Sequence, residues 1–82
     1  MIATAYVVRW DCLPDFRKTF PTIELPASTD ALNIEVDGDR AVLLEAFGED
    51  TDGCFDMTLP IDAGNAAQLA SFAGQYGDPC AA

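Results

Sequence analysis

The chain contains no histidine, and this absence removes several kinds of active site at once. Ser-His and Cys-His nucleophile pairs need an imidazole base, and many zinc sites need a histidine ligand. A hydrolase of the catalytic-triad type is therefore excluded. Cysteine is also scarce, because Cys12, Cys54 and Cys80 are an odd number without Cys-x-x-Cys spacing. We expect three reduced thiols, no disulfide framework and no metal site.

Positive charge is nearly as scarce as cysteine. The only cations are Arg9, Arg17, Lys18 and Arg40, and they oppose fourteen aspartates and glutamates, for a net charge of −10. All four cations lie in residues 1–40, so residues 41–82 contain no basic partner for their carboxylates. Such a charge repels nucleic-acid phosphates and anionic membranes, so neither is expected as a direct ligand. A basic protein surface is the favoured partner.

Long apolar runs are missing too. No stretch approaches the roughly 20 residues that span a bilayer, and the N-terminal residues lack the basic start of a signal peptide. We expect a cytoplasmic protein, monomeric or a small homo-oligomer. Half of the 82 residues are hydrophobic, so residues 1–82 should form one domain with its own core. So short a chain hardly builds a substrate cleft, and we expect neither catalysis nor a cofactor.

The N-terminal half predicts one long strand followed by less regular structure. Residues 2–10 are apolar or β-prone at nearly every position, which is typical of a strand. Residues 11–20 fit a short helix with Pro14 in its first turn, or an irregular loop. Residues 22–25 are bounded by two prolines, so they can form only a short edge segment, because each proline removes a hydrogen-bond donor.

The rest of the chain predicts a hairpin, a further strand and a helix. Residues 32–36 alternate, Asp37-Gly38 suits a tight turn, and residues 41–47 form the return strand. A third strand covers residues 54–59. Asp62 is a suitable helix N-cap, and an apolar stripe follows it before Gly77 and Pro79: Ala66, Leu69, Phe72, Ala73 and Tyr76. We expect an α+β fold, a mostly antiparallel sheet of about four strands with one C-terminal helix on one face.

Alternation then predicts a row of carboxylates on the face opposite the helix. The residues expected to point toward the helix are Ile23, Leu25, Leu32, Ile34, Val36, Val42, Leu44, Phe55, Met57 and Leu59. The side chains between them include Glu24, Glu35, Glu45 and Asp56. The acidic loop Glu49, Asp50, Asp52 and the turn pair Asp37, Asp39 should extend this charge at the ends of the strands. Together these nine residues are the predicted partner-binding surface.

The hairpin register decides whether this row exists. A two-residue Asp37-Gly38 turn would place Glu35 opposite Arg40 and would put Val42 on the face of Glu35. A three-residue loop, residues 37–39, pairs Ile34 with Val42 and keeps the carboxylates together. We favour the second register because it buries more apolar side chains.

Two further features of the acidic region need interpretation. Phe47 and Trp10 are candidate interface anchors, although packing in the core is the simpler interpretation of both. The sequence Asp50-Thr51-Asp52-Gly53 partly matches a calcium loop. It lacks the first aspartate of that motif, and Leu59 stands where the bidentate glutamate belongs, so calcium binding is not expected.

Size, acidity and the expected α+β build give the whole chain a general resemblance to the small acidic DNA-mimic inhibitors of phages and mobile elements, which include anti-CRISPR proteins. No single motif carries this resemblance. It implies inhibition by occupying the nucleic-acid site of a basic protein or complex. An acidic immunity or antitoxin-like protein against a basic toxin fits the same residues. A structural or assembly subunit, whose acidity serves only solubility, is the remaining alternative.

Overall fold

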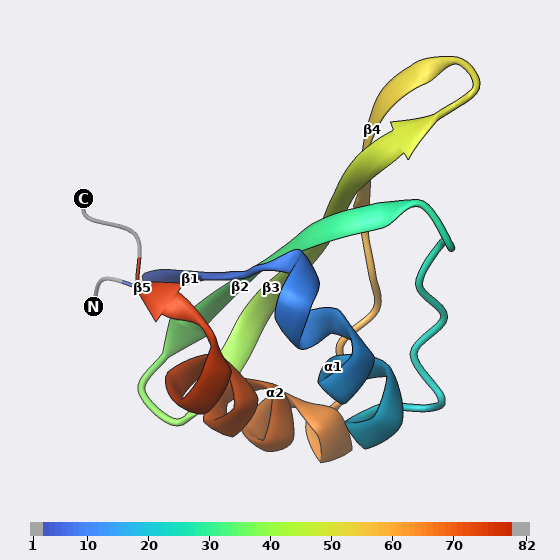
Figure 1. Ribbon diagram of the computed structural model, residues 1–82. Helices are drawn as coiled ribbons and strands as arrows, with labels where there is room; N and C mark the ends of the chain where they lie inside the picture. Colours follow the sequence, from blue (N-terminus) through green and yellow to red (C-terminus); the bar gives the residue numbers. More distant parts are fainter. Residues whose placement is uncertain (1–2, 80–82) are drawn as a thin grey trace.

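The computed structural model describes residues 3–79, and in it two α-helices cover one face of an antiparallel sheet (Figure 1). The strands lie in the order β4-β3-β2-β1-β5 and are β1 (Thr4–Val8), β2 (Thr29–Asp37), β3 (Arg40–Asp50), β4 (Gly53–Thr58) and β5 (Asp78–Pro79). The helical segments are a 3-10 helix η1 (Trp10–Cys12), α1 (Leu13–Thr19) and α2 (Ala63–Tyr76). The predicted α+β fold with a C-terminal helix on the sheet is confirmed, and β5 is an additional short strand.

Helix α2 begins and ends where the sequence predicts. The Asp62 carboxylate accepts a hydrogen bond from Asn65 N at 2.9 Å, and Asn65 Oδ1 accepts one from Asp62 N at 2.8 Å, which together form a capping box. At the other end, Gly77 N donates to Ala73 O at 2.9 Å. The apolar stripe is buried against the sheet at Ala66, Leu69, Phe72 and Ala73. Tyr76, the last member of the stripe, is 41% exposed.

Three phenylalanines join the two helices above the sheet. Phe16 and Phe20 of the α1 region lie with their ring centroids 4.8 Å apart, and both contact Phe72 of α2 edge-on, at 5.3 and 5.7 Å. Each edge-to-face pair contributes about 0.5–1.5 kcal/mol beyond the burial of its area. Beneath the rings lie the fully buried side chains of the sheet: Val8, Leu32, Ile34 and Leu44.

The β2–β3 register differs from both registers considered above. Asp37 pairs with Arg40 across a two-residue turn, Gly38–Asp39, and a bulge follows, so that Val42 and Leu43 together oppose Glu35. Ile34 therefore pairs with Leu44 rather than with Val42. The three-residue loop is wrong, and so is the inward placement of Val42, which is 54% exposed. The extra residue restores the alternation, so Ile34 and Leu44 still share the buried face.

Two predicted strands need correction. Residues 22–25 form no strand and belong to the connection between α1 and β2, where Arg17 donates to the carbonyls of Leu25 (3.2 Å) and Pro26 (2.9 Å). Ile23 and Leu25 nevertheless pack against the core, as expected. Strand β1 begins at Thr4 and ends at Val8, so it is shorter than the predicted 2–10, and Ile2 lies outside the described residues.

Gly48 of β3 pairs with Thr29, the first residue of β2, and the surrounding atoms leave no room for a side chain at this position. A Cβ at this position would overlap Ser28 O and would lie 2.8 Å from a ring carbon of Phe55. We expect Gly48→Ala to lower the free energy of unfolding by about 1–3 kcal/mol, because backbone must shift to accommodate the methyl group. Urea denaturation followed by circular dichroism measures this. Gly74→Ala is the matched control, because a Cβ there meets open space on α2. This substitution should raise the free energy of unfolding by about 1 kcal/mol, since alanine favours the helix more than glycine does. Equal stabilities of the two variants would contradict the packing.

Candidate functional site

The sheet face away from the helices carries carboxylates from three strands. Alternation places Glu35 and Glu45 on this open face, because their neighbours in β2 and β3 are buried beneath the helices. In β4, Asp56 pairs with Phe47 and so shares the same face, and Glu49 follows two residues beyond Phe47. We call Glu35, Glu45, Asp56 and Glu49 the acidic row. Their common face is the one that the sequence predicts, although the predicted register was wrong.

No two members of the acidic row stand directly opposite each other. Glu45 pairs with Asn33, whose Nδ2 donates to Glu45 Oε1 at 3.1 Å, and Glu35 pairs with Leu43. Successive members on adjacent strands are diagonal neighbours, which lie about 7–8 Å apart on one face of an antiparallel sheet. This spacing is close to the screening length of about 8 Å at physiological ionic strength, so their mutual repulsion is moderate. Neutral cross-strand partners therefore allow the sheet to tolerate the row.

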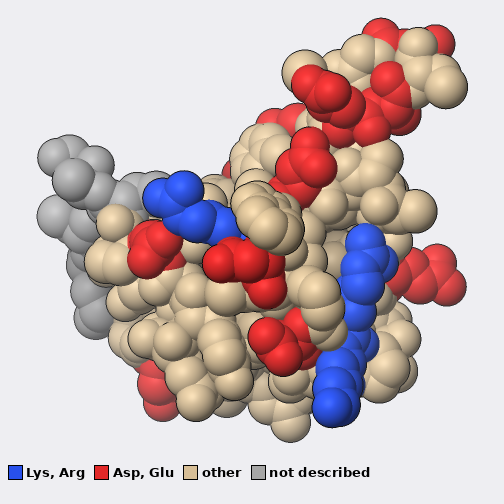
Figure 2. All heavy atoms as spheres, viewed as in Figure 1, with Lys and Arg blue, Asp and Glu red and all other residues tan. Residues whose placement is uncertain are grey.

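The β3–β4 hairpin extends beyond the rest of the sheet. The ladder with β2 ends where Thr29 pairs with Gly48, so residues 49–54 pair only within their own hairpin (Figure 1). Figure 2 shows acidic side chains gathered on this protruding arm, whereas the body of the molecule carries the basic side chains together with further acidic ones. We call residues 49–56 the acidic arm. Its carboxylates are Glu49, Asp50, Asp52 and Asp56.

The tip of the arm explains the partial calcium motif. Asp50 Oδ1 accepts a hydrogen bond from Asp52 N at 2.9 Å, and Gly53 has a φ of +117°, which disfavours other residues. Asp50-Thr51-Asp52-Gly53 thus forms a hairpin turn. Within residues 3–79, no group of three thiols or carboxylates is arranged to hold a metal ion.

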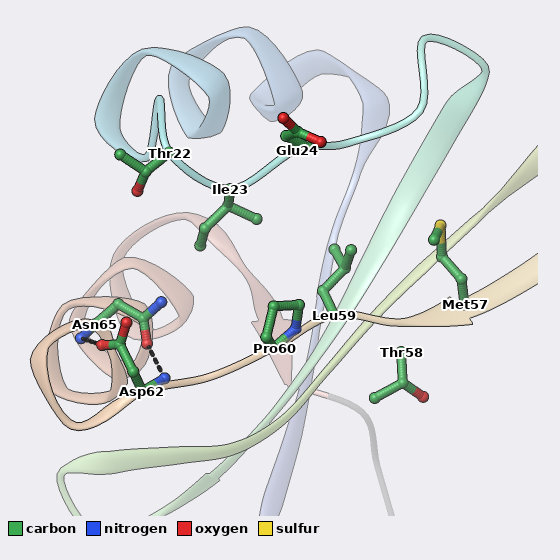
Figure 3. A pocket seen from close by; sticks show the side chains of 9 residues that line it. All are labelled: Thr22, Ile23, Glu24, Met57, Thr58, Leu59, Pro60, Asp62 and Asn65. Atoms are coloured by element: carbon green, nitrogen blue, oxygen red, sulfur yellow. Dashed lines mark hydrogen bonds between the residues drawn. The ribbon is translucent and has the colours of Figure 1, made fainter.

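The remaining predicted site residues lie in two places. Asp37 and Asp39 are at the β2–β3 turn, at the opposite end of the long strands from the arm, and Asp37 pairs with Arg40. Among the predicted site residues, Glu49 and Asp50 belong to strand β3 rather than to a loop, and Glu24 is not on the open face. Glu24 lies in the loop after α1 and lines a groove beside β4, on the helix side (Figure 3). The alternation used to place Glu24 does not apply, because its segment is not a strand.

Two of the four cations are engaged away from the acidic row. Arg9 Nε donates to Asp78 Oδ2 at 2.8 Å, the one ion pair within residues 3–79, and this hydrogen bond raises the pKa of Arg9. Arg17 donates to backbone carbonyls, as described above. Within residues 3–79, no carboxylate of the acidic row or the acidic arm forms an ion pair.

Apolar side chains accompany the acidic row. The half-buried Phe47 and Leu43 lie on the open face, and β1 adds Ala5 and Val7, which pair with Glu35 and Asn33. No helix of the described chain covers this face. Trp10 is 73% exposed, and neither it nor Phe47 belongs to the core cluster. Core packing is thus the wrong interpretation of both aromatic residues.

The described thiols differ in environment. Cys54 is exposed on the arm, whereas Cys12 is half-buried, with Sγ 3.9 Å from Tyr76 O. Burial, and then the nearby Asp11 carboxylate, raise the pKa of Cys12. Both effects disfavour the thiolate, which is the nucleophilic form. Cys80 lies outside the described residues.

A raised thiol pKa predicts slow alkylation of Cys12. Around pH 8, iodoacetamide should modify Cys12 several-fold more slowly in the folded protein than in the urea-unfolded chain, and the difference should narrow as the pH rises. Peptide-resolved mass spectrometry measures the rate, with the exposed Cys54 as internal reference. Asp11→Asn should accelerate the reaction. Equal rates for Cys12 in the folded and unfolded chains would contradict this account.

The site combines carboxylates without counter-ions, an uncovered apolar surface and a protruding hairpin. Such a surface is suited to binding a cationic partner, since opposite charge attracts the partner and apolar contact retains it. No helix in the described part of the chain is long and apolar enough to cross a membrane. Comparison with protein-family models, with curated proteins and with solved structures finds no match to this chain.

Proposed function

We propose that this chain is a non-enzymatic inhibitor that occupies the nucleic-acid site of a basic protein or complex. The acidic row and the acidic arm stand in for phosphates. The observation that carries the proposal is the continuity of this charge, which begins on the central strand β2 at Glu35 and ends at the tip of the arm, with no cation among residues 41–79.

The physical basis is electrostatic complementarity. Duplex DNA presents one negative charge per roughly 1.7 Å of helix axis, and a protein groove that binds it is lined with lysine and arginine. The same groove attracts carboxylates that are held on paired strands, because the strands already fix their backbone positions and only the side chains must be ordered on binding. The arm projects from the body and so can enter a groove that would exclude a flat surface.

Apolar contact should supply the lifetime of the complex. Exposed charges at an interface mainly increase the association rate, whereas desolvated aromatic side chains contribute most of the affinity. Phe47 lies directly opposite Asp56, so a groove that meets the row also meets this ring. Acidity that served solubility alone would not require an uncovered apolar face beside it.

Capture from a host lysate tests the proposal. The immobilised protein should retain a nucleic-acid-binding protein at about 50 mM NaCl, lose most of it at about 200 mM, and release it when duplex DNA or RNA is added. Mass spectrometry identifies the retained protein. Retention that nucleic acid does not compete would reject the mimicry, and a retained basic protein without a nucleic-acid site would favour the immunity-type alternative.

Charge reversal localises the surface in the same assay. The triple variant Glu35→Lys, Glu45→Lys, Asp56→Lys should bind the captured protein at least about 100-fold more weakly, because like-charge contacts cost several kcal/mol. The control variant Asp11→Lys, Asp15→Lys, Asp30→Lys changes the net charge equally at exposed positions outside the acidic row. Equal loss in both variants would show that net charge, and not the row, determines binding.

Phe47 allows the aromatic contribution to be separated from charge. Phe47→Ala should weaken binding by about 30-fold, the effect of a typical interface hot spot, and should change the unfolding free energy little because the ring lies outside the core. Isothermal titration calorimetry with the captured protein measures the affinity. Phe72→Ala is the opposite control, since the loss of this buried ring should cost about 3–5 kcal/mol of stability. A stability loss of that size in Phe47→Ala would place the ring in the fold rather than in the interface.

A further inference from the structure

Strand β4 has one unpaired side. It is the edge strand next to β3, and no other strand of the described chain lies against its outer edge. Every residue of β4 except Phe55 is exposed. At the opposite edge of the sheet, the edge strand is β5, which is only two residues long. The outer edge of β4 is thus the long open edge of this sheet, and such an edge can pair with another chain.

The direction of the β4 backbone groups follows from the ladder. Leu59 N donates to Leu44 O at 2.8 Å, and the β3–β4 register contains no bulge. In an antiparallel ladder, alternate residues bond to the same neighbour, so Met57 and Phe55 face β3 as Leu59 does. The N–H and C=O groups of Asp56 and Thr58 therefore point to the open edge.

A groove lies along the C-terminal half of this edge. It encloses about 490 Å³ between β4, the loop after α1 and the start of α2. Figure 3 shows Met57 and Leu59 pointing toward Ile23 and Glu24, whereas Thr58 points to the other side of the strand. Met57 is 40% exposed within the groove. The edge thus offers backbone hydrogen bonds beside an apolar surface.

We infer that the open edge of β4 receives an extended, basic segment of the partner as an added strand. Successive side chains of such a segment alternate between the two faces. One set would meet Met57 and the free carboxylate of Glu24 in the groove, because the Asp62 carboxylate is already engaged in the helix cap. The other set would meet Asp56 on the open face.

Charge selects this occupant over a second copy of the chain. Antiparallel pairing of two β4 strands would join two chains that each carry a net charge of −10, with an Asp56 on each paired strand, and like charges on paired strands are destabilising. A segment that alternates lysine or arginine with apolar residues finds opposite charge on both faces. The inference rests on the proposed function only in that the segment belongs to the same cationic partner.

A synthetic peptide of alternating lysine and valine tests the edge directly. Hydrogen exchange followed by NMR should show the Asp56 and Thr58 amides exchanging about tenfold more slowly in the presence of the peptide, since each gains a hydrogen bond. The same peptide N-methylated at every residue keeps its charge and cannot pair, so it should give no protection. Binding of the first peptide without slower exchange at these two amides would overturn the inference.

The variant Thr58→Pro separates the contribution of edge hydrogen bonds to binding from the contribution of charge. It removes one outward N–H without changing the net charge or a β3–β4 hydrogen bond, and proline is tolerated at such edge positions. It should weaken peptide binding about tenfold, whereas the control Thr58→Val should not. If Thr58→Pro binds the captured partner normally while the Glu35, Glu45, Asp56 reversal does not, the proposed function stands and strand addition is rejected. A wild-type dimer that Thr58→Pro converts to a monomer would also overturn the inference.

Discussion

The bulge at Val42 determines which side of the sheet every later residue of β3 occupies. If the ladder continued unbroken from the Asp37–Arg40 pair, Leu44 would oppose Asn33 and Glu45 would oppose Leu32. Glu45 and Phe47 would then lie beneath the helices, and Leu44 and Ala46 would lie on the open face. One extra residue reverses this outcome. It places Leu44 in the core and the carboxylates of β3 on the outside.

The bulge also governs β4, because β4 pairs only with β3. Its register places Asp56 opposite Phe47, so the face chosen for Phe47 is the face of Asp56. The burial of Leu32, Ile34 and Leu44 under α2 provides the driving force, since fully burying one such side chain contributes about 1.5–3 kcal/mol. Apolar burial on one face therefore maintains the acidic row on the other.

Alternation within a strand could be predicted from the sequence, but its interruptions could not. The alternation of residues 32–36 and 54–59 correctly gives the faces of Glu35 and Asp56, and Asp62 correctly marks the start of α2. Val42 misled the prediction because unbroken alternation places it on the face of Leu44, whereas here it is the extra residue of the bulge. The two-residue turn alone would reverse the faces of β3 relative to the prediction, and the bulge reverses them back. Leu44 and Glu45 therefore lie on the faces predicted for them, although the predicted three-residue loop does not form.

Two further features depend on tertiary structure. Glu24 was placed by extending the alternation into residues 22–25, which are held as a loop by the hydrogen bonds of Arg17 to Leu25 and Pro26. The arm was not predicted, because its projection depends on β2 ending at its pairing with Gly48 while β3 continues to Asp50. Strand length can be estimated from sequence, but the relative ends of paired strands require the register.

Acidic side chains on an edge hairpin have two physical consequences that favour the same partner. Charge on an edge strand discourages pairing between copies of the chain, which protects a protein with an open edge from aggregation. The same charge does not discourage a segment of opposite sign. The edge of β4 therefore disfavours pairing with a second copy of this chain and favours the proposed pairing with a basic strand.

The acidic row, the open-face aromatic residue and the β4 edge act over different distances. Coulombic attraction reaches about 8 Å at physiological ionic strength, so the arm and row affect the approach of a partner and its orientation. In the proposed complex, contact with Phe47 and hydrogen bonds to β4 act only after docking, and they govern dissociation. Salt should then slow association without an equal effect on dissociation. A surface with charge alone would bind every basic protein briefly, and the short-range contacts are what select one partner among them.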